Sequence, residues 1–218
     1  MSRRRAAIFI SGRGSNMRSL IEAAQAPDYP AEIALVLSNR PEAEGLAFAR
    51  ALGVQTAAVD HKIYAGRAEF EKSVQVLLDL HRIELICLAG FMRLLTPGFV
   101  RAWEGRLLNV HPALLPAYRG LHTHERALAD GVKIHGCTVH FVVPEMDEGP
   151  IIAQAAVAVL DDDTPDTLAA RVLAQEHVLY PAVLAEVARG HVHVAGNRTR
   201  LDAAVQEFAP LQVPRINR

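Results

Sequence analysis

The sequence predicts an α/β protein: a mostly parallel, Rossmann-like open sheet with helices on both faces and an antiparallel C-terminal strand pair. Three observations predict this fold. Short apolar runs alternate with segments of helical periodicity through the first half of the chain. These runs are apolar on both faces, which is typical of buried parallel strands. After residue 112 two longer strands follow with too few residues between them for a crossover helix, so they should pair antiparallel.

The first half contains five predicted strands and three predicted helices in alternation. The strands are Ala6–Ser11, Ile33–Ser38, Val54–Val59, Glu84–Ala89 and Arg106–Val110. The helices are Asn16–Ala26, Glu42–Leu52 and Arg67–His81. Because each helix lies between two strands, the pattern implies right-handed βαβ units.

The second half begins with two strands, Ile134–Val143 and Pro150–Val159, joined by a turn-rich segment. A helix should follow from Thr164-Pro165-Asp166, where Thr is the N-cap, Pro the first helical residue and Asp a favourable charge on the helix dipole. We expect this helix to reach about Gly190 and Pro181 to kink or divide it. The acidic run Asp161–Asp163 is expected to be its solvated lead-in.

Composition points to an ordinary globular protein. Half of the 218 residues are hydrophobic, 22% are charged and the net charge is −1, which argues against nucleic-acid binding by bulk electrostatics. The arginines of Arg3–Arg5 are expected to be solvated, since the apolar run behind them is too short for a signal peptide, and no run approaches a membrane span. Cys87 and Cys137 lie in apolar runs and are expected to be reduced thiols of a cytoplasmic protein.

A glycine-rich turn, Ser11-Gly12-Arg13-Gly14-Ser15-Asn16, joins the first strand to the first helix. Such a turn presents backbone N–H groups and the positive end of a helix dipole, so it predicts a phosphate site. A tight turn that merely needs glycine remains the alternative. A dinucleotide fingerprint would have glycine at Met17, but Arg40 would suit a 2′-phosphate, so an NADP-dependent reductase stays open. One monophosphate fits the short loop better.

Polar side chains end the fifth strand. Asn109 and His111 are two residues apart and should point to the same side at the carboxyl edge of the sheet. Asp147, in the later turn, and His140, on the strand before it, can join them there. In such a trio the amide stabilises an oxyanion, the imidazole moves a proton and the carboxylate orients the imidazole. A satisfied polar pair at a strand end is the alternative for Asn109 and His111.

Two other side-chain chemistries fit the sequence poorly. His122 and His124 match no common zinc spacing, so no metal is expected. There is no G-x-S-x-G motif and no activated cysteine, so the nucleophile should come from the substrate.

Over residues 6 to 190 the chain resembles the glycinamide ribonucleotide formyltransferases. The matching motifs run from Ile10 to Asn16, Leu88 to Leu95, Leu108 to Pro116, Gly120 to His124, Met146 to Pro150, and Gln175 to His177. The Asn109–Pro116 stretch is shared with other folate-dependent formyltransferases and with deformylases. The Gly-Ser-Asn loop and the Gly-Leu-His-Thr-His segment are particular to the glycinamide ribonucleotide enzymes.

The resemblance implies one formyltransferase domain over residues 1–218. It comprises a phosphate-binding half (1–105), a catalytic and folate-binding half (106–190) and a C-terminal tail (191–218). The implied reaction transfers the formyl group of 10-formyltetrahydrofolate, a co-substrate, to the amine of 5′-phosphoribosylglycinamide in de novo purine (IMP) biosynthesis. It needs no metal, and neither nucleic acid nor membrane is an expected partner. Formation of a homodimer stays open.

The resemblance also assigns the site residues. The catalytic trio is Asn109, His111 and Asp147. The substrate's phosphate would lie on Gly14, Ser15 and Asn16, with Glu176 near its amine and ribose. The folate would contact Arg67, Met92, Arg93, Leu94, Leu95, Asn109, Val143, Pro144, Glu145, Met146 and Asp147. Met146 and Glu148 stand where relatives vary, which leaves the pose of this loop open.

Three rivals remain at this stage. A formyltetrahydrofolate deformylase would use the same trio to activate water. A methionyl-tRNA formyltransferase shares the trio, although the chain has no basic bias. A non-catalytic nucleotide-binding module would keep the phosphate loop and do no chemistry.

Overall fold

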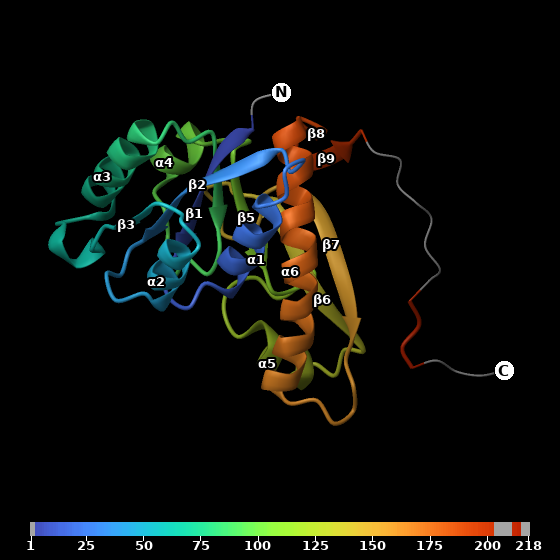
Figure 1. Cartoon of the computed structure of the whole chain (residues 1–218). Coiled ribbons are helices and arrows are strands. Elements are labelled where there is room, and N and C mark those ends of the chain that lie inside the picture. The colour runs from blue at the N-terminus through green and yellow to red at the C-terminus, as the bar shows by residue number, and fades with distance from the viewer. Residues whose placement is uncertain (1–2, 203–210, 215–218) are drawn as a thin grey trace.

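The computed structural model describes residues 3–202 and 211–214 (Figure 1). The strands within these residues are β1 (Arg4–Ile10), β2 (Ala31–Ser38), β3 (Thr56–Ala58), β4 (Leu85–Leu88), β5 (Leu107–His111), β6 (Ile134–Phe141), β7 (Ile151–Ala158), β8 (Val192–Ala195) and β9 (Arg198–Leu201). The helices are α1 (Ser15–Ala24), α2 (Glu44–Ala51), a 3₁₀ turn η1 (His61–Ile63), α3 (Arg67–Leu80), α4 (Pro97–Ala102), α5 (Thr123–Ala129) and α6 (Pro165–Arg189).

The described strands form one sheet in the order β3-β2-β1-β4-β5-β6-β7-β9-β8. Strands β1 to β5 pair in parallel, and β6 pairs antiparallel with both β5 and β7. The predicted fold class, including the antiparallel pair, is therefore confirmed. The predicted tail contributes a hairpin, β8–β9, which extends the sheet beyond β7.

Helices cover both faces of the sheet, as Figure 1 shows. Alternate residues of β1 face opposite layers: Ala6, Ile8 and Ile10 pack with α1, α2 and α6, whereas Ala7 and Phe9 pack with α3 and α4. Because β1 is buried on both sides, its residues 6–10 form a continuous apolar run in the sequence.

Helix α6 continues through Pro181, so the predicted division at this residue is wrong. Its start is as predicted: Thr167 N–H donates to the Thr164 side chain at 3.3 Å, and Gly190 ends the helix at φ 80°. Pro181 and its neighbour Tyr180 are buried, and the Tyr180 hydroxyl contacts the carbonyls of Leu88 and Leu108 at 3.1 Å. Packing against the sheet thus outweighs the local cost of proline.

Two charged segments differ from the prediction. Arg4 and Arg5 belong to β1, and Arg5 forms an ion pair with Glu32 at 2.8 Å, so the arginine run is not a free solvated terminus. The Asp163 side chain is only 2% exposed and accepts two hydrogen bonds from Arg171, at 2.7 and 2.8 Å. That guanidinium lowers the pKa of Asp163. The lead-in to α6 is therefore partly an ion pair, not only a solvated run.

None of the helices in the described ranges is long and apolar enough to span a membrane.

Candidate active site

The candidate site lies at the carboxyl ends of β1, β4 and β5, which are neighbours in the sheet. Chain connection reverses direction at β1, because β2 lies on one side of it and β4 on the other. Open α/β sheets bind ligands at this kind of switch point. The segments that follow the three strands are the phosphate loop (Ser11–Asn16), a segment we call the donor segment (Gly90–Thr96), and the residues after His111.

The phosphate loop leaves the first N–H groups of α1 free of helical partners. Gly14 occupies the N-cap position at φ 71°, a left-handed conformation that favours glycine, and no side chain caps α1 in the described part of the chain. The first turn of a helix offers unpaired donors and a positive dipole end. The loop therefore has the geometry of an anion cradle.

Asn16 and Glu176 connect this cradle to α6. The Asn16 amide donates to a Glu176 oxygen at 2.6 Å, and both side chains are buried. The Asn16 Oδ1 atom is buried with no hydrogen-bond partner among the described residues. Desolvation raises the pKa of Glu176, while the hydrogen bond from Asn16 works against this rise. Of the residues assigned to the acceptor, these two are in direct contact.

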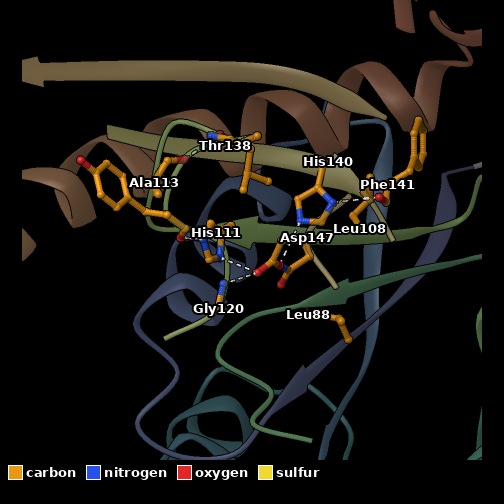
Figure 2. A network of polar contacts seen from close by, with 12 residues as sticks. Leu88, Leu108, His111, Ala113, Gly120, Thr138, His140, Phe141 and Asp147 are labelled. Atoms are coloured by element: carbon orange, nitrogen blue, oxygen red, sulfur yellow. Dashed lines mark hydrogen bonds and ion pairs between the residues drawn. The ribbon is translucent and has the colours of Figure 1, made fainter. Parts of the chain in front are cut away.

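Asp147 lies close to both His111, at the end of β5, and His140 (Figure 2), and Asn109 joins this group through a contact with His140. His111 Nδ1 lies 3.5 Å from one Asp147 oxygen, and this oxygen accepts from Gly120 N–H at 2.8 Å. His140 Nε2 lies 3.9 Å from the other Asp147 oxygen and 3.2 Å from Asn109 Nδ2. An amide, two imidazoles and a carboxylate therefore share one small volume.

The two nitrogens of His111 have different surroundings. Nε2 lies 2.9 Å from the Tyr118 carbonyl, which can only accept, so Nε2 carries a proton and donates. Nδ1, which faces Asp147, is then the nitrogen that can take up or release a proton. The separation of 3.5 Å is long for a direct hydrogen bond, so a bridging water or a substrate atom fits this side of the ring.

His140 is held as a neutral imidazole. Burial lowers its pKa, and the Phe141 carbonyl and the Asp147 charge oppose this to a lesser degree. Its Nδ1 donates to the Phe141 carbonyl at 2.9 Å, which leaves Nε2 to accept from the Asn109 amide. This contact follows from the sheet register, since Asn109 and His140 are directly opposite in the β5–β6 ladder. His140 thus fixes which way the Asn109 amide points.

Backbone geometry places Asp147 in this group. Asp147 has φ 55°, a left-handed conformation that Asp tolerates better than most residues. A Cβ atom at Gly149 would lie 1.8 Å from the Phe141 carbonyl oxygen, so only glycine lets the turn return this close to β6. In the Met146–Pro150 motif the glycine is therefore a steric requirement, and the aspartate supplies the carboxylate.

Several contacts fix the donor segment. The Phe91 ring packs on Phe9 with centroids 5.3 Å apart, and the Arg93 guanidinium lies 5.3 Å from the Phe70 ring centroid. At the far end Thr96 N–H donates to the buried Glu71 carboxylate at 2.6 Å.

Large apolar side chains are exposed on the donor segment and in the 143–146 segment. Met92, Leu94 and Met146 are each more than half exposed. Arg67 is exposed at the start of α3, and Leu95 is partly buried. In the 143–146 segment Val143 is partly buried, whereas Pro144 and Glu145 are exposed.

A histidine cluster lies beside the trio. His124 packs edge-on to His135 at 5.3 Å, and His135 packs on Tyr118 at 5.7 Å. Burial lowers the pKa of both histidines, that of His135 to about 4. His122 is exposed and contacts Glu125 at 3.3 Å. Within residues 3–202 and 211–214 no three His, Cys, Asp or Glu side chains are arranged to hold a metal ion.

A cavity of about 440 Å³ adjoins Asp147 on the side of the β8–β9 hairpin. Its lining includes Arg119, Glu148 and Arg198. Because Asp147 contacts both this cavity and the histidines, the cavity gives solvent a path to the carboxylate.

Sequence reasoning missed several residues that shape the site. The Tyr118 carbonyl and Gly120 N–H hold His111 and Asp147, but backbone groups have no sequence signature. The contact between Ser11 and Asn39, in contrast, could have been predicted from the sequence. These residues directly follow β1 and β2, and the last residues of the two strands, Ile10 and Ser38, are paired. Parallel pairing alone brings residues 11 and 39 together.

The chain is similar to known proteins over most of its length. Residues 4–184 match the Formyl transferase family model. The human trifunctional purine biosynthetic protein adenosine-3 is 45% identical over 193 residues, which are 88% of this chain and 19% of that protein. The chain therefore spans about a fifth of that relative.

Two relatives are similar over nearly their full length. The Escherichia coli phosphoribosylglycinamide formyltransferase is 41% identical over 89% of this chain and 92% of its own. The crystal structure of the phosphoribosylglycinamide formyltransferase from Brucella melitensis is 55% identical, with a TM-score of 0.83 over 89% of this chain and 100% of that one.

Proposed function

The chain belongs to the formyl transferase family, among the phosphoribosylglycinamide formyltransferases, and we propose that it formylates 5′-phosphoribosylglycinamide in de novo purine (IMP) biosynthesis. The formyl donor is 10-formyltetrahydrofolate, and the acceptor is the substrate's amine. Gly14, Ser15 and Asn16 hold the acceptor's phosphate, with Glu176 beside its amine and ribose. The donor contacts Arg67, Met92, Arg93, Leu94, Leu95, Asn109, Val143, Pro144, Glu145, Met146 and Asp147.

One observation carries this proposal. An uncapped helix N-terminus at the end of β1 and an Asn-His-Asp trio at the end of β5 lie on the same edge of one sheet. The first suits a phosphate and the second suits acyl transfer. A protein that only binds a nucleotide needs the first and has no use for the second.

In the proposed reaction the acceptor amine attacks the formyl carbon, and the Asn109 amide donates to the oxyanion that forms. The amine loses a proton as its bond to carbon forms. When the bond from carbon to the folate nitrogen breaks, that nitrogen gains a proton. His111 Nδ1, the ring nitrogen that faces Asp147, mediates both proton transfers, because Nε2 donates to the Tyr118 carbonyl. A water between Nδ1 and Asp147 fits this path.

The expected contributions of these groups to the reaction rate are of the usual size. Loss of one oxyanion donor costs about 2.7–4 kcal/mol in the barrier. A positioned acid–base group contributes about 10² to 10⁴ in rate. Holding the two substrates side by side supplies much of the rest, because effective molarities in oriented sites reach about 10⁵ M or more.

The deciding experiment follows loss of 10-formyltetrahydrofolate by absorbance, with and without glycinamide ribonucleotide. A transferase consumes donor only when the acceptor is present, and the formylated acceptor appears in equal amount. Asn109→Ala is the matched control, since it should bind both substrates and transfer slowly. Equal donor loss in both cuvettes, with free formate as product, would establish a deformylase.

Three further properties belong to this proposal. The continuous sheet through both halves supports a single formyltransferase domain over residues 1–218. Free, buried Cys87 and Cys137 support a reducing, cytoplasmic location. The substrates are small molecules, and sedimentation at micromolar concentration would test for a homodimer.

A further inference from the structure

Ser11, the first residue of the phosphate loop, is hydrogen-bonded to the donor segment. Its backbone N–H donates to the Gly90 carbonyl at 3.1 Å, and its hydroxyl oxygen accepts from Met92 N–H at 2.8 Å. The Ser11 residue is 4% exposed, so water does not compete for these bonds. One side chain thus bridges the two loops that follow β1 and β4.

The direction of the Ser11 hydroxyl is fixed by Asn39. The hydroxyl donates its single proton to Asn39 Oδ1 at 2.6 Å, which leaves a lone pair aimed at Met92 N–H. Asn39 is buried, and both its side-chain amide nitrogen and its backbone carbonyl oxygen lie close to His61 Nδ1, at 3.2 and 2.8 Å. Because both neighbours of the hydroxyl are held, the bridge has one geometry.

The other contacts of the donor segment come from outside the phosphate loop. Phe91 packs on Phe9 of β1, Arg93 on Phe70 of α3, and Thr96 bonds to Glu71 of α3. These contacts can make the segment rigid, but they do not connect it to the residues that would hold a phosphate. Among the described contacts of the segment, those of Ser11 make that connection.

We propose that Ser11 is a positioning residue that couples the two substrate sites, so that ordering of the phosphate loop by the acceptor favours binding of the folate, and the reverse. This inference rests on the proposed function. Ligand-induced ordering of one loop lowers the entropy cost of ordering the other when the two are bonded together. The coupling must be reciprocal, because it is a property of the two binding equilibria.

The test measures the dissociation constant of glycinamide ribonucleotide by calorimetry, with and without saturating tetrahydrofolate, which carries no formyl group and cannot react. In the parent protein tetrahydrofolate should tighten acceptor binding by about 5-fold or more, within the range of ordinary coupling factors. In Ser11→Ala this factor should fall to about 1–2. The reverse titration should give the same factors.

Thr96→Ala is the matched control. It removes the hydroxyl that donates to Glu71 and accepts from Phe99 N–H at the far end of the donor segment, and it leaves the Ser11 bridge intact. It should weaken binding of tetrahydrofolate alone while the coupling factor stays at the parent value. If Ser11→Ala folds poorly, Ser11→Cys is a second test variant. A thiol fills a similar space to the hydroxyl but forms only weak hydrogen bonds.

The outcomes separate this inference from the function it rests on. If both ligands bind the parent and the factor is 1, or if Ser11→Ala and Ser11→Cys keep the parent factor, the inference is wrong and the proposed function stands. If the parent binds neither ligand, both are wrong. Loss of coupling in Thr96→Ala equal to that in Ser11→Ala would also overturn the special role of Ser11.

Discussion

At the scale of single residues, the arrangement around His111 limits how the reaction can run. In many acid–base sites a carboxylate holds one imidazole nitrogen while the other nitrogen faces the substrate. Here the Tyr118 carbonyl takes the holding role, and Asp147 is on the reactive side. Asp147 and His111 should therefore act on the same proton path, as one unit.

This unit predicts strong non-additivity. His111→Ala and Asp147→Asn should each lower the single-turnover rate by about 10² to 10⁴. The double variant should be little slower than the slower single variant, because either change breaks the same path. Binding of both substrates should persist in all three proteins. Rate effects that simply multiply in the double variant would mean that the two side chains act independently.

Asn109 should behave differently from this pair. Asn109→Ala removes a donor aimed at the oxyanion, so we expect a rate loss of about 10² to 10³. The measurement is single-turnover formyl transfer with both substrates saturating. A rate within tenfold of the parent would contradict the assignment.

Gly14 supports a prediction about binding of the acceptor alone. At φ 71° an L side chain costs about 1–2 kcal/mol, so Gly14→Ala should distort the cradle. A change of this size corresponds to roughly 5- to 30-fold in the acceptor's dissociation constant, with tetrahydrofolate binding changed much less. Gly66→Ala is the control, because that glycine has an extended backbone and no atom within 4 Å of an added Cβ. If Gly14→Ala weakened binding of both ligands equally, the loop would not be a site specific to the acceptor.

At the scale of elements, the apolar strands were predictable and the short polar-rich elements were not. Strands β1, β2, β4 and β5 overlap the predicted strands, because strands that are buried on both faces are mostly apolar in sequence. Helices α4 and α5 have six and seven residues, too few for a helical period to appear. The hairpin β8–β9 lies mostly at the surface and its strands have four residues each, so the alternation of histidine and valine at 191–194 indicates exposed strand residues but is too short to predict the hairpin.

The same contrast holds within the site. Asn109 and His111 were predictable because a strand of period two puts them on one side. The bond from Ser11 to Met92 N–H joins segments 81 residues apart, and it depends on the strand order β2-β1-β4, which the alternating pattern alone does not specify. The continuation of α6 through Pro181 likewise depends on tertiary packing.

Helix α2 supports the phosphate loop from behind, and Gly45 makes the contact possible. Gly45 N–H donates to the Gly12 carbonyl at 3.1 Å. An added Cβ would lie 2.6 Å from Ile10 Cδ1 and 3.0 Å from the carbonyl oxygens of Gly12 and Arg13. The Ile10 side chain can rotate, but the two backbone oxygens can retreat only if the loop or the helix moves.

We therefore expect Gly45→Ala to weaken acceptor binding by about tenfold, a change near 1.4 kcal/mol, and to lower the melting temperature. Gly98→Ala is the matched control, since only the Thr96 hydroxyl, at 3.9 Å, is near its added Cβ. Both changes favour a helix intrinsically, so propensity cannot explain a difference between them. Unchanged acceptor binding in Gly45→Ala would show that α2 does not support the loop.

At the scale of the whole molecule, buried histidines should set the stability in weak acid. His124, His135 and His140 have pKa values lowered by burial, that of His135 to about 4. Unfolding returns them to about 6.5, so the unfolded chain binds more protons between these values. Stability should therefore fall as the pH falls through this range. Glu176 acts in the opposite direction, because burial raises its pKa and its charged form is disfavoured in the folded protein.

His135 offers the clearest test, because it is 1% exposed and neither ring nitrogen has a hydrogen-bond partner among the described residues. Between pH 7 and pH 4.5 this one group should remove about 2–3 kcal/mol from the free energy of unfolding. His135→Phe keeps a ring against His124 and Tyr118 but cannot bind a proton, so its stability should depend less on pH, whatever its value at pH 7. Val139→Ala, a change at a buried residue of the same strand that binds no proton, should lower stability but keep the pH dependence of the parent. Urea unfolding at several pH values measures the free energy of unfolding of each protein as a function of pH. If this free energy depends on pH in His135→Phe as steeply as in the parent, His135 does not titrate in this range.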